Sequence, residues 1–309
     1  MSDHSGIPLA MDFFADMAEL ARQELLASGY TVDSSRKPDE IVMSYFNVLW
    51  RRINVRPRTV FIAKDLKCPA DLQAGFDLVR AKAQKGEDIR PHQSRKLADL
   101  DFDDGLLNDW GINHLHLGTS LESDGFVTRT GPVLFARVTA DEFYCVAVME
   151  HGNWSKQQLL DIIHDNWPAS ISRSTLRGVG LEWQPTDDDV RKLRAAGVTV
   201  ITQRPDGTIH FPPGGGVATD RTSMSVVNRV IGWRTLCSRL EEETTRKLDD
   251  LLQEATRLGV ELRPPLRFHL KISGGKTRAV EEASQAFVDF GPALAVEKIA
   301  GAFVQALSS

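Results

Sequence analysis

The sequence predicts an α+β protein, with a small twisted antiparallel sheet flanked by helices and a mostly helical C-terminal domain. Three short apolar runs within residues 110–154 alternate polar and apolar positions between turn-like segments, a pattern that favours antiparallel strands. Elsewhere, apolar residues recur every three or four positions, as on the buried face of a helix. We expect a helical N-terminal segment at 1–57, the α+β domain at 58–168, and a helical or mixed domain at 169–309.

The first half of the chain carries clear signals for where elements begin and end. Pro38 suits the first turn of a helix, Gly86 suits the residue after a helix, and Pro168 cannot continue one. Short segments between the last three strands suit antiparallel hairpins. The expected elements are helices at 8–28, 39–53, 69–83 and 155–165 and strands at 58–63, 110–118, 129–138 and 142–151.

Helical patterns dominate the second half. Residues 187–196 have an acidic first turn and basic residues further on, which matches a helix dipole. Residues 205–207 suit a hairpin turn, and the PPGGG run at 212–216 predicts a hinge or flexible loop. The expected elements are helices at 187–196, 225–258 (one helix or a pair), 277–287 and 293–307 and strands at 198–203, 208–211 and 266–272.

The overall composition is that of a globular protein. Hydrophobic residues make up 42% and charged residues 26% of the chain, and the net charge of −5 gives no global case for nucleic acid binding. Residues 51–100 differ, because they hold 12 Lys and Arg against 6 Asp and Glu. Such a basic surplus could hold a phosphate backbone or form a solvated helix face.

The cysteines and the apolar runs bear on the cellular compartment. Cys68, Cys145 and Cys237 are odd in number and widely spaced, which argues against a disulfide framework or a cysteine zinc site and fits a reducing cytoplasm. The N-terminus lacks a secretory pattern, and no run of 18 apolar residues occurs. We therefore expect a cytoplasmic protein that does not span a membrane.

Basic side chains gather on the predicted sheet. His114 and His116 lie two apart in the first strand, so both point to one face. Arg129 enters the second strand, and His151 ends the third. If these strands pair as neighbours, the four side chains converge.

These residue types suit metal-free cleavage of RNA. The reaction needs a base for the 2′-hydroxyl proton, an acid for the leaving oxygen, and cations to stabilise the phosphorane charge. Imidazoles act as acid and base near neutral pH, and a guanidinium binds phosphate. We predict catalytic roles for His114, His116, Arg129 and His151. Substrate-binding roles are predicted for Lys156, Trp154, Arg95 and Lys96, with the tryptophan stacking a base.

The same residues allow other interpretations. The His-x-His pair could chelate a metal, given a third ligand from the third strand or from the acidic residues before the first strand. One histidine could be structural and the other merely exposed. Trp154 could be a core aromatic, and Arg129 could pair with Glu122 or Asp124.

The order of these elements resembles the RelE/ParE toxin superfamily, in which a helical hairpin precedes a twisted antiparallel sheet. Here a helix and a basic connector ending in RKL precede strands that contain HLHLG, RTGPVLFARV and YCVAVMEHGNW. In that family the second strand opens with an arginine, and the third ends in His or a basic residue before Lys and an aromatic. Arg129, His151 and Lys156 match these positions in kind.

The chain also departs from that family. The family's first-strand arginine is replaced by His116, its C-terminal catalytic tyrosine has no clear match, and residues 118–128 form a long connector. The resemblance covers roughly residues 70–168. It implies a ribosome-dependent or free mRNA endoribonuclease whose chemistry is carried by the three histidines and Arg129.

We therefore predict a metal-independent endoribonuclease-like protein, a toxin or phage-defence component that uses no cofactor. Its expected partners are RNA or the ribosome, and an antitoxin or a second copy bound through the helices. The alternative is a non-catalytic scaffold that binds nucleic acid or protein with the same sheet, since a fold does not imply a function. The enzyme hypothesis requires the histidines and Arg129 to converge in an open cleft.

Two further motifs have simpler explanations. Residues 273–277 (SGGKT) resemble the end of a phosphate-binding loop, but Leu270 occupies the position of its first glycine. A glycine turn leading into a helix is expected there instead. His164, in the sequence HDNWP, is expected at a helix end, where a histidine favours the dipole.

Overall fold

The computed structural model describes residues 7–292, which divide into two compact units. Residues 7–46 and 228–292 form one unit, and residues 47–227 form the other. Helices α2 (Pro38–Arg51) and α7 (Met224–Arg246) connect them along the chain. The three consecutive segments expected from the sequence do not coincide with these units, and the helix expected at 293–307 lies outside the described residues.

The unit at 47–227 is built on a four-stranded sheet with the order β2-β5-β4-β3. Its strands are β2 (Thr59–Ile62), β3 (Ile112–His116), β4 (Pro132–Val138) and β5 (Glu142–Glu150). β3, β4 and β5 pair antiparallel, as expected, whereas β2 pairs parallel with β5. The sheet is therefore mixed, because the chain crosses over between β2 and β5.

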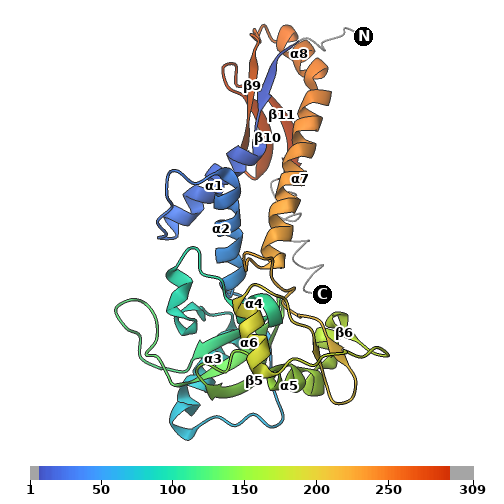
Figure 1. Cartoon of the computed structure of the whole chain (residues 1–309). Coiled ribbons are helices and arrows are strands. Elements are labelled where there is room, and N and C mark those ends of the chain that lie inside the picture. The colour runs from blue at the N-terminus through green and yellow to red at the C-terminus, as the bar shows by residue number, and fades with distance from the viewer. Residues whose placement is uncertain (1–6, 293–309) are drawn as a thin grey trace. The chain divides into compact units, whose positions relative to one another are not determined.

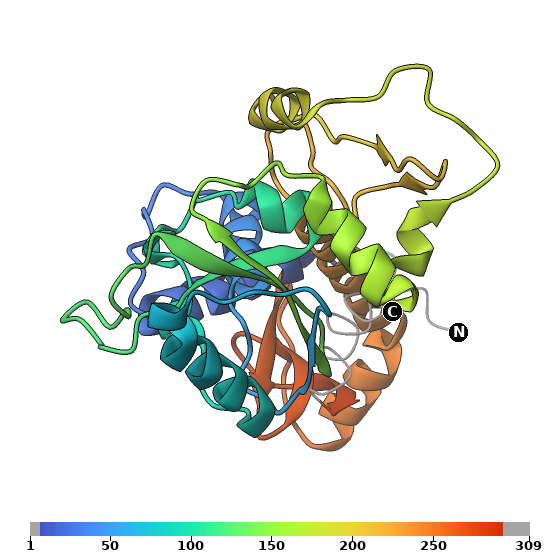
Figure 2. The same ribbon diagram turned by 90° about the horizontal axis from the view of Figure 1, so that it is seen from below.

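Helices cover both faces of this sheet. Figure 2 shows the green strands between the teal helix α3 (Gln73–Lys85) and the yellow-green helix α5 (Gln158–Asn166). On the α3 face, Phe76 and Val79 pack against Leu115, Leu134 and other buried residues. On the α5 face, the core contains Leu159, Leu160, Ile163, Ile112, Val133 and Phe135. Both cores follow from the period-2 alternation of the strands.

Shorter elements complete this unit. They are η1 (Ala70–Leu72), η2 (Arg90–His92), η3 (Arg95–Ala98), α4 (Gly105–Trp110), η4 (Pro168–Ser174), β6 (Thr175–Leu176), α6 (Asp187–Ala195), β7 (Thr202–Gln203) and β8 (Ile209–His210). β6, β8 and β7 form a small antiparallel sheet in that order. Thr186 caps α6 through a capping box with Asp189, and this helix was expected. The pairing of β7 with β8 confirms the expected hairpin about residues 205–207.

The other unit combines a sheet with helices (Figure 1). Its elements are β1 (Leu9–Met11), α1 (Phe13–Ala27), most of α2 and α7, α8 (Leu248–Arg257), β9 (Leu266–Ser273), β10 (Lys276–Glu281) and β11 (Phe287–Pro292). The sheet order is β1-β9-β10-β11. Helix α1 contacts α7, since the Phe13 N–H donates to Glu241 at 2.8 Å. Across residues 7–292, no helix combines the length with the apolarity that crossing a bilayer demands.

The prediction of a helix at 277–287 was wrong. Residues Lys276–Glu281 form β10, which pairs antiparallel with β9 and β11. Gly274 and Gly275 both have positive φ, 56° and 70°, and they connect Ser273 to its partner Lys276. Two glycines in this conformation make the tight hairpin turn whose twist suits paired strands. The Gly-Gly pair is thus a strand-to-strand turn, not a helix start.

The PPGGG segment is packed against α4 instead of forming a free loop. Gly214 and Gly216 donate their N–H groups to the carbonyls of Asp109 and Asn108, at 2.9 and 3.0 Å. A Cβ atom on Gly214 would lie 2.4 Å from the Leu107 carbonyl oxygen, closer than packing allows. The glycines therefore let this segment satisfy carbonyls at the end of the helix.

Another glycine lets α3 contact the end of β3. A Cβ atom on Gly75 would lie 1.7 Å from the carbonyl oxygen of Leu117, the residue after His116. Similarly, a Cβ atom on Gly118 would lie 2.1 Å from the carbonyl oxygen of Thr128. These two close backbone approaches fix the chain immediately beside the histidines of β3.

We expect Gly75→Ala to destabilise the protein by about 2 kcal/mol or more, because the new methyl group must displace backbone. Alanine is otherwise the better helix former by roughly 1 kcal/mol, so helix propensity alone predicts that the substitution stabilises the protein. Urea denaturation of the variant measures the change. The control is Gly180→Ala, whose Cβ would meet only the Gln203 side chain, at 3.9 Å. Equal stability of the two variants would contradict the close approach.

Candidate functional site

Three histidines meet at one end of the sheet in the unit at 47–227. His114 and His116 share a face of β3, and the β4–β5 ladder continues to a hydrogen bond from the His151 N–H to the Gly131 carbonyl, 2.9 Å long. The ring centroids of His114 and His116 lie 6.3 Å apart, and those of His116 and His151 lie 5.7 Å apart. We call these three residues, with Arg129 and Trp154, the histidine cluster.

Arg129 joins the cluster through its guanidinium. Its Nη2 lies 3.2 Å from Nε2 of His151, and both side chains are exposed. Glu122 and Asp124, on the loop before Arg129, ion-pair with Arg95. The predicted convergence of the four residues is therefore observed, and these two carboxylates are held by a different arginine.

His116 is fixed by two hydrogen bonds. Its Nδ1 lies 3.2 Å from the backbone N–H of Thr130, which can only donate, so Nδ1 accepts and the neutral ring carries its proton on Nε2. The His116 carbonyl lies 2.9 Å from Nδ1 of His92, whose Nε2 is 3.2 Å from the Lys82 ammonium. Because an ammonium only donates, His92 must donate from Nδ1.

The environment lowers the pKa of all three histidines of the cluster. Burial, followed by the charge of Arg129, lowers the pKa of His116 to about 4. Burial and then Arg129 also lower the pKa of His151. Burial lowers the pKa of His114, and the Asp104 carboxylate opposes that shift. Burial and the neighbouring cation thus both disfavour a positive charge on these rings.

The ring of Trp154 packs against two histidines of the cluster. Its ring centroid lies 4.5 Å from that of His114, 4.7 Å from that of His151 and 5.5 Å from that of Phe135. The Trp154 carbonyl accepts a hydrogen bond from Arg194 of α6. The tryptophan is partly buried against the apolar core, so the structure places it among packed side chains.

Arg194 is itself held by a buried carboxylate. Its Nη2 lies 2.8 Å from Oδ2 of Asp109, and the exposed fractions of the two side chains are 9% and 1%. Its guanidinium also lies 4.4 Å from the centroid of the Trp110 ring. Burial raises the pKa of Asp109, and the charge of Arg194 opposes that shift.

The other predicted substrate-binding residues have local carboxylate partners. Lys156 lies 3.1 Å from Asp187, and Lys96 lies 3.4 Å from Asp99. Arg95 is engaged by Glu122 and Asp124, as described above. A substrate phosphate would have to compete with these carboxylates at each position.

A small pocket opens beside His114. Phe102 and Asp104 line it together with Asn113, which neighbours His114 on β3. Its other lining residues are Arg51, Gln93, Ser94 and Leu97. His116 is only 3% exposed, whereas His151 and Arg129 are exposed.

Metal binding was one interpretation of the His-x-His pair. Within residues 7–292, the structure contains no group of three His, Cys, Asp or Glu side chains arranged to hold a metal ion.

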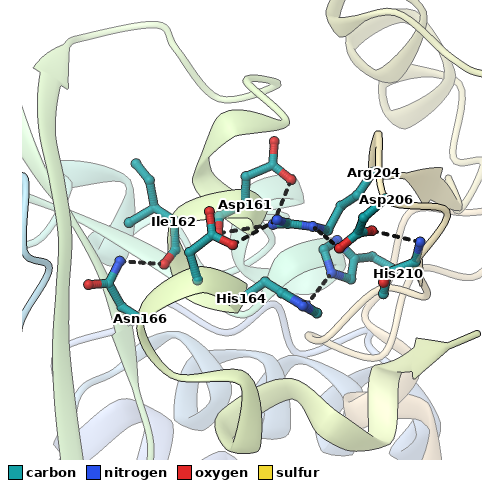
Figure 3. A network of polar contacts seen from close by, with 9 residues as sticks. Asp161, Ile162, His164, Asn166, Arg204, Asp206 and His210 are labelled. Carbon is teal, nitrogen blue, oxygen red and sulfur yellow. Dashed lines mark hydrogen bonds and ion pairs between the residues drawn. The ribbon is translucent and has the colours of Figure 1, made fainter.

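A second pair of histidines lies between α5 and the β7–β8 hairpin. His210 Nε2 lies 3.2 Å from His164 Nδ1, and Figure 3 shows Arg204 beside this pair. Arg204 ion-pairs with Asp161 at 3.1 Å and with Asp165 at 2.7 Å, both on α5. His164 lies in the last turn of α5, as expected. This network attaches the hairpin to the helix, and its carboxylates already neutralise its one arginine.

Sequence reasoning missed three residues that shape the histidine cluster. Thr130 sets the tautomer of His116, His92 binds its carbonyl, and Arg194 binds Trp154. Thr130 directly follows Arg129, so its position gave a local signal. His92 and Arg194 lie 24 and 40 residues from their partners, and no local pattern connects them.

No family model, curated protein or solved structure matches the chain. The resemblance to the RelE/ParE superfamily therefore stays a prediction.

We expect the free energy of unfolding to decrease as the pH is lowered, partly because of His116. Its folded-state pKa of about 4 lies below the ordinary 6.5, so the unfolded chain binds more protons between these values. Stability is therefore lost as pH falls from 6.5 towards 4, by up to about 3 kcal/mol for this residue.

Urea denaturation at several pH values, compared with His116→Asn, measures this contribution. The asparagine side chain keeps an oxygen that can accept the hydrogen bond from the Thr130 N–H, but it does not titrate. Its stability should depend less steeply on pH across this window. Parallel curves for the two proteins would show that His116 is not held neutral.

Proposed function

We propose that the chain cleaves RNA by acid–base catalysis at the histidine cluster. The observation that carries the proposal is the convergence of three imidazoles on an exposed guanidinium. Arg129 contacts His151 at 3.2 Å, and among residues 7–292 no carboxylate forms an ion pair with it. A cation beside neutral acid–base groups suits an anionic phosphodiester.

The proposed reaction is an intramolecular transesterification. The 2′-oxygen attacks phosphorus, the bond from phosphorus to the 5′-oxygen breaks, and the products are a 2′,3′-cyclic phosphate and a 5′-hydroxyl. His151 accepts the proton of the 2′-hydroxyl at Nε2. His114, in its protonated form, gives its proton to the leaving 5′-oxygen and becomes neutral, since it is the cluster histidine whose protonated form a nearby carboxylate, that of Asp104, favours.

His116 has a different role in this proposal. Its Nδ1 accepts from Thr130, so its Nε2–H is the group free to contact the substrate. A neutral imidazole held this way donates a hydrogen bond to a phosphate oxygen without serving as a base. Together with Arg129, it stabilises the charge that develops on the phosphorane.

The second histidine pair is a weaker candidate for such chemistry. Three carboxylates, those of Asp161, Asp165 and Asp206, lie around Arg204. An anionic substrate would be repelled there. The surroundings of the two groups of histidines differ in charge, and this difference favours the histidine cluster.

The wider setting of the activity is proposed on the sequence resemblance. A RelE/ParE-like ribonuclease would act without a metal on free or ribosome-bound mRNA, as a toxin or phage-defence component. An antitoxin or a second copy would then bind through the helices. These partners are proposals that follow from the family pattern.

A non-catalytic scaffold is the alternative. The near-complete burial of His116 favours it, because a buried ring contributes to the fold whether or not a substrate binds. In that case Arg129 would bind the phosphate of a nucleic acid that is not cut. The experiment below separates binding from cleavage.

Purified protein incubated with labelled single-stranded RNA should produce fragments that end in a 2′,3′-cyclic phosphate, and EDTA should not prevent it. His151→Gln should slow cleavage by about 100-fold or more, the usual cost of losing a general base. Arg129→Gln should reduce the rate by a similar factor, because it removes charge stabilisation. Gel analysis of the fragments measures both effects.

His269→Gln is the matched control, since His269 is an exposed histidine of the other unit. Its cleavage rate should equal that of the unaltered protein. Loss of activity in EDTA would restore the metal interpretation of His114 and His116. RNA binding that depends on Arg129, without cleavage of free or ribosome-bound RNA, would establish the scaffold alternative.

We expect the pH optimum of kcat/KM to lie below 6.5. This parameter reports the free protein, in which the pKa values of all three cluster histidines are lowered. The protonated acid becomes scarcer as pH rises through its lowered pKa, so kcat/KM should decline above the optimum. Cleavage rates from pH 4.5 to 8.5 would show this. An optimum above pH 7.5 would contradict the assigned acid.

A further inference from the structure

The proposed general base is occupied in the free protein. Nε2 of His151 lies 3.2 Å from Nη2 of Arg129, and a guanidinium has only donors. The imidazole therefore accepts this hydrogen bond with the lone pair that would otherwise take a substrate proton. Its remaining proton lies on Nδ1.

Arg129 is free to change partners. It lies on the surface, and the carboxylates of its own loop are held by Arg95. The next residue, Thr130, is anchored, since its N–H bonds Nδ1 of His116 and its hydroxyl accepts from the Leu117 N–H at 3.2 Å. The backbone next to Arg129 is thus fixed, while its exposed side chain reaches Nε2 of His151.

We propose that Arg129 is a reversible cap on His151, which turns to the phosphate of a bound phosphodiester and thereby frees Nε2 to accept a proton. This inference rests on the proposed function and adds that the substrate itself activates the base. A phosphodiester is the stronger partner, because a guanidinium bonds an anionic oxygen more strongly than a neutral nitrogen.

The exchange conserves protons and needs no other reactant. Arg129 stays protonated throughout, exchanging one acceptor for another. The freed Nε2 takes the 2′-hydroxyl proton as the 2′-oxygen bonds to phosphorus, and the proton lost from His114 goes to the departing 5′-oxygen. The groups that face His151 are the rings of His114 and His116 from β3, the guanidinium of Arg129, and the Trp154 ring.

Nitrogen-15 NMR of histidine-labelled protein tests the cap without requiring catalysis. The probe is a 2′-deoxy dinucleotide, which has the phosphodiester but no 2′-hydroxyl and cannot be cleaved. In the free protein, His151 should show an unprotonated Nε2 and a proton on Nδ1. Saturation with the dinucleotide should raise the pKa of His151 by about 1 unit or more, because a cation leaves and an anion arrives.

Two arginine variants supply the comparison. In free Arg129→Gln, the pKa of His151 should be higher than in the free unaltered protein. Binding of the dinucleotide should then raise this pKa by a smaller amount than it does in the unaltered protein. Arg177→Gln removes an exposed arginine outside the cluster and should behave as the unaltered protein does. His151→Gln assigns the signal.

Several results would overturn the cap. They are an unchanged pKa of His151 at saturating dinucleotide, the same His151 pKa in the free unaltered protein and in Arg129→Gln, and no detectable dinucleotide binding at millimolar concentration. If the expected pKa changes occur but no RNA is cleaved, the cap stands and the proposed function fails. If RNA is cleaved without those changes, the function stands and the cap fails.

Discussion

The buried ion pair between Arg194 and Asp109 is the contact on which the candidate site depends. It joins α6 to α4, and the same guanidinium binds the carbonyl of Trp154. Removing one partner of such a pair leaves an unpaired buried charge, which typically costs about 3–5 kcal/mol. The ring of Trp154 lies against both His114 and His151, so this contact helps to hold the tryptophan beside the two histidines that the paired strands bring together.

The histidine cluster separates a fixed half from an adjustable half. His116 is buried and bonded at both its ring and its carbonyl, so its tautomer is set before any ligand arrives. His151 and Arg129 are exposed and bond each other. Binding of an anion is favoured by donors that are already oriented, as in the first half, and by groups that can exchange partners, as in the second.

The sequence predicted the part of the site that depends on local periodicity. Two histidines at i and i+2 in a strand must share a face, and the antiparallel pairing of β3, β4 and β5 then brings Arg129 and His151 beside them. Contacts between distant segments gave no such pattern. Arg194 is charged and lies on a helix, so it resembled a solvated residue. Its side chain is only 9% exposed and pairs with Asp109, which lies 85 residues earlier in the chain.

The errors in predicting the fold have physical causes too. The parallel pairing of β2 with β5 joins residues 83 positions apart, such as Thr59 and Glu142, so the sequence near either strand could not reveal it. The Gly274–Gly275 turn was misinterpreted because the short strand after it also allows a helical pattern. Only its pairing with β9 and β11 decides between the two.

Strand β3 lies at the edge of its sheet, and an edge strand exposes backbone groups that another chain can pair with. The imidazole of His92 occupies the carbonyl of His116, and the adjacent carbonyl of Pro91, a residue with no N–H of its own, binds Val127 at 2.9 Å. The carbonyl of His116 is therefore already paired and cannot accept from a strand added at this edge. The hydrogen bond that joins His116 to His92 thus also opposes strand addition at this residue.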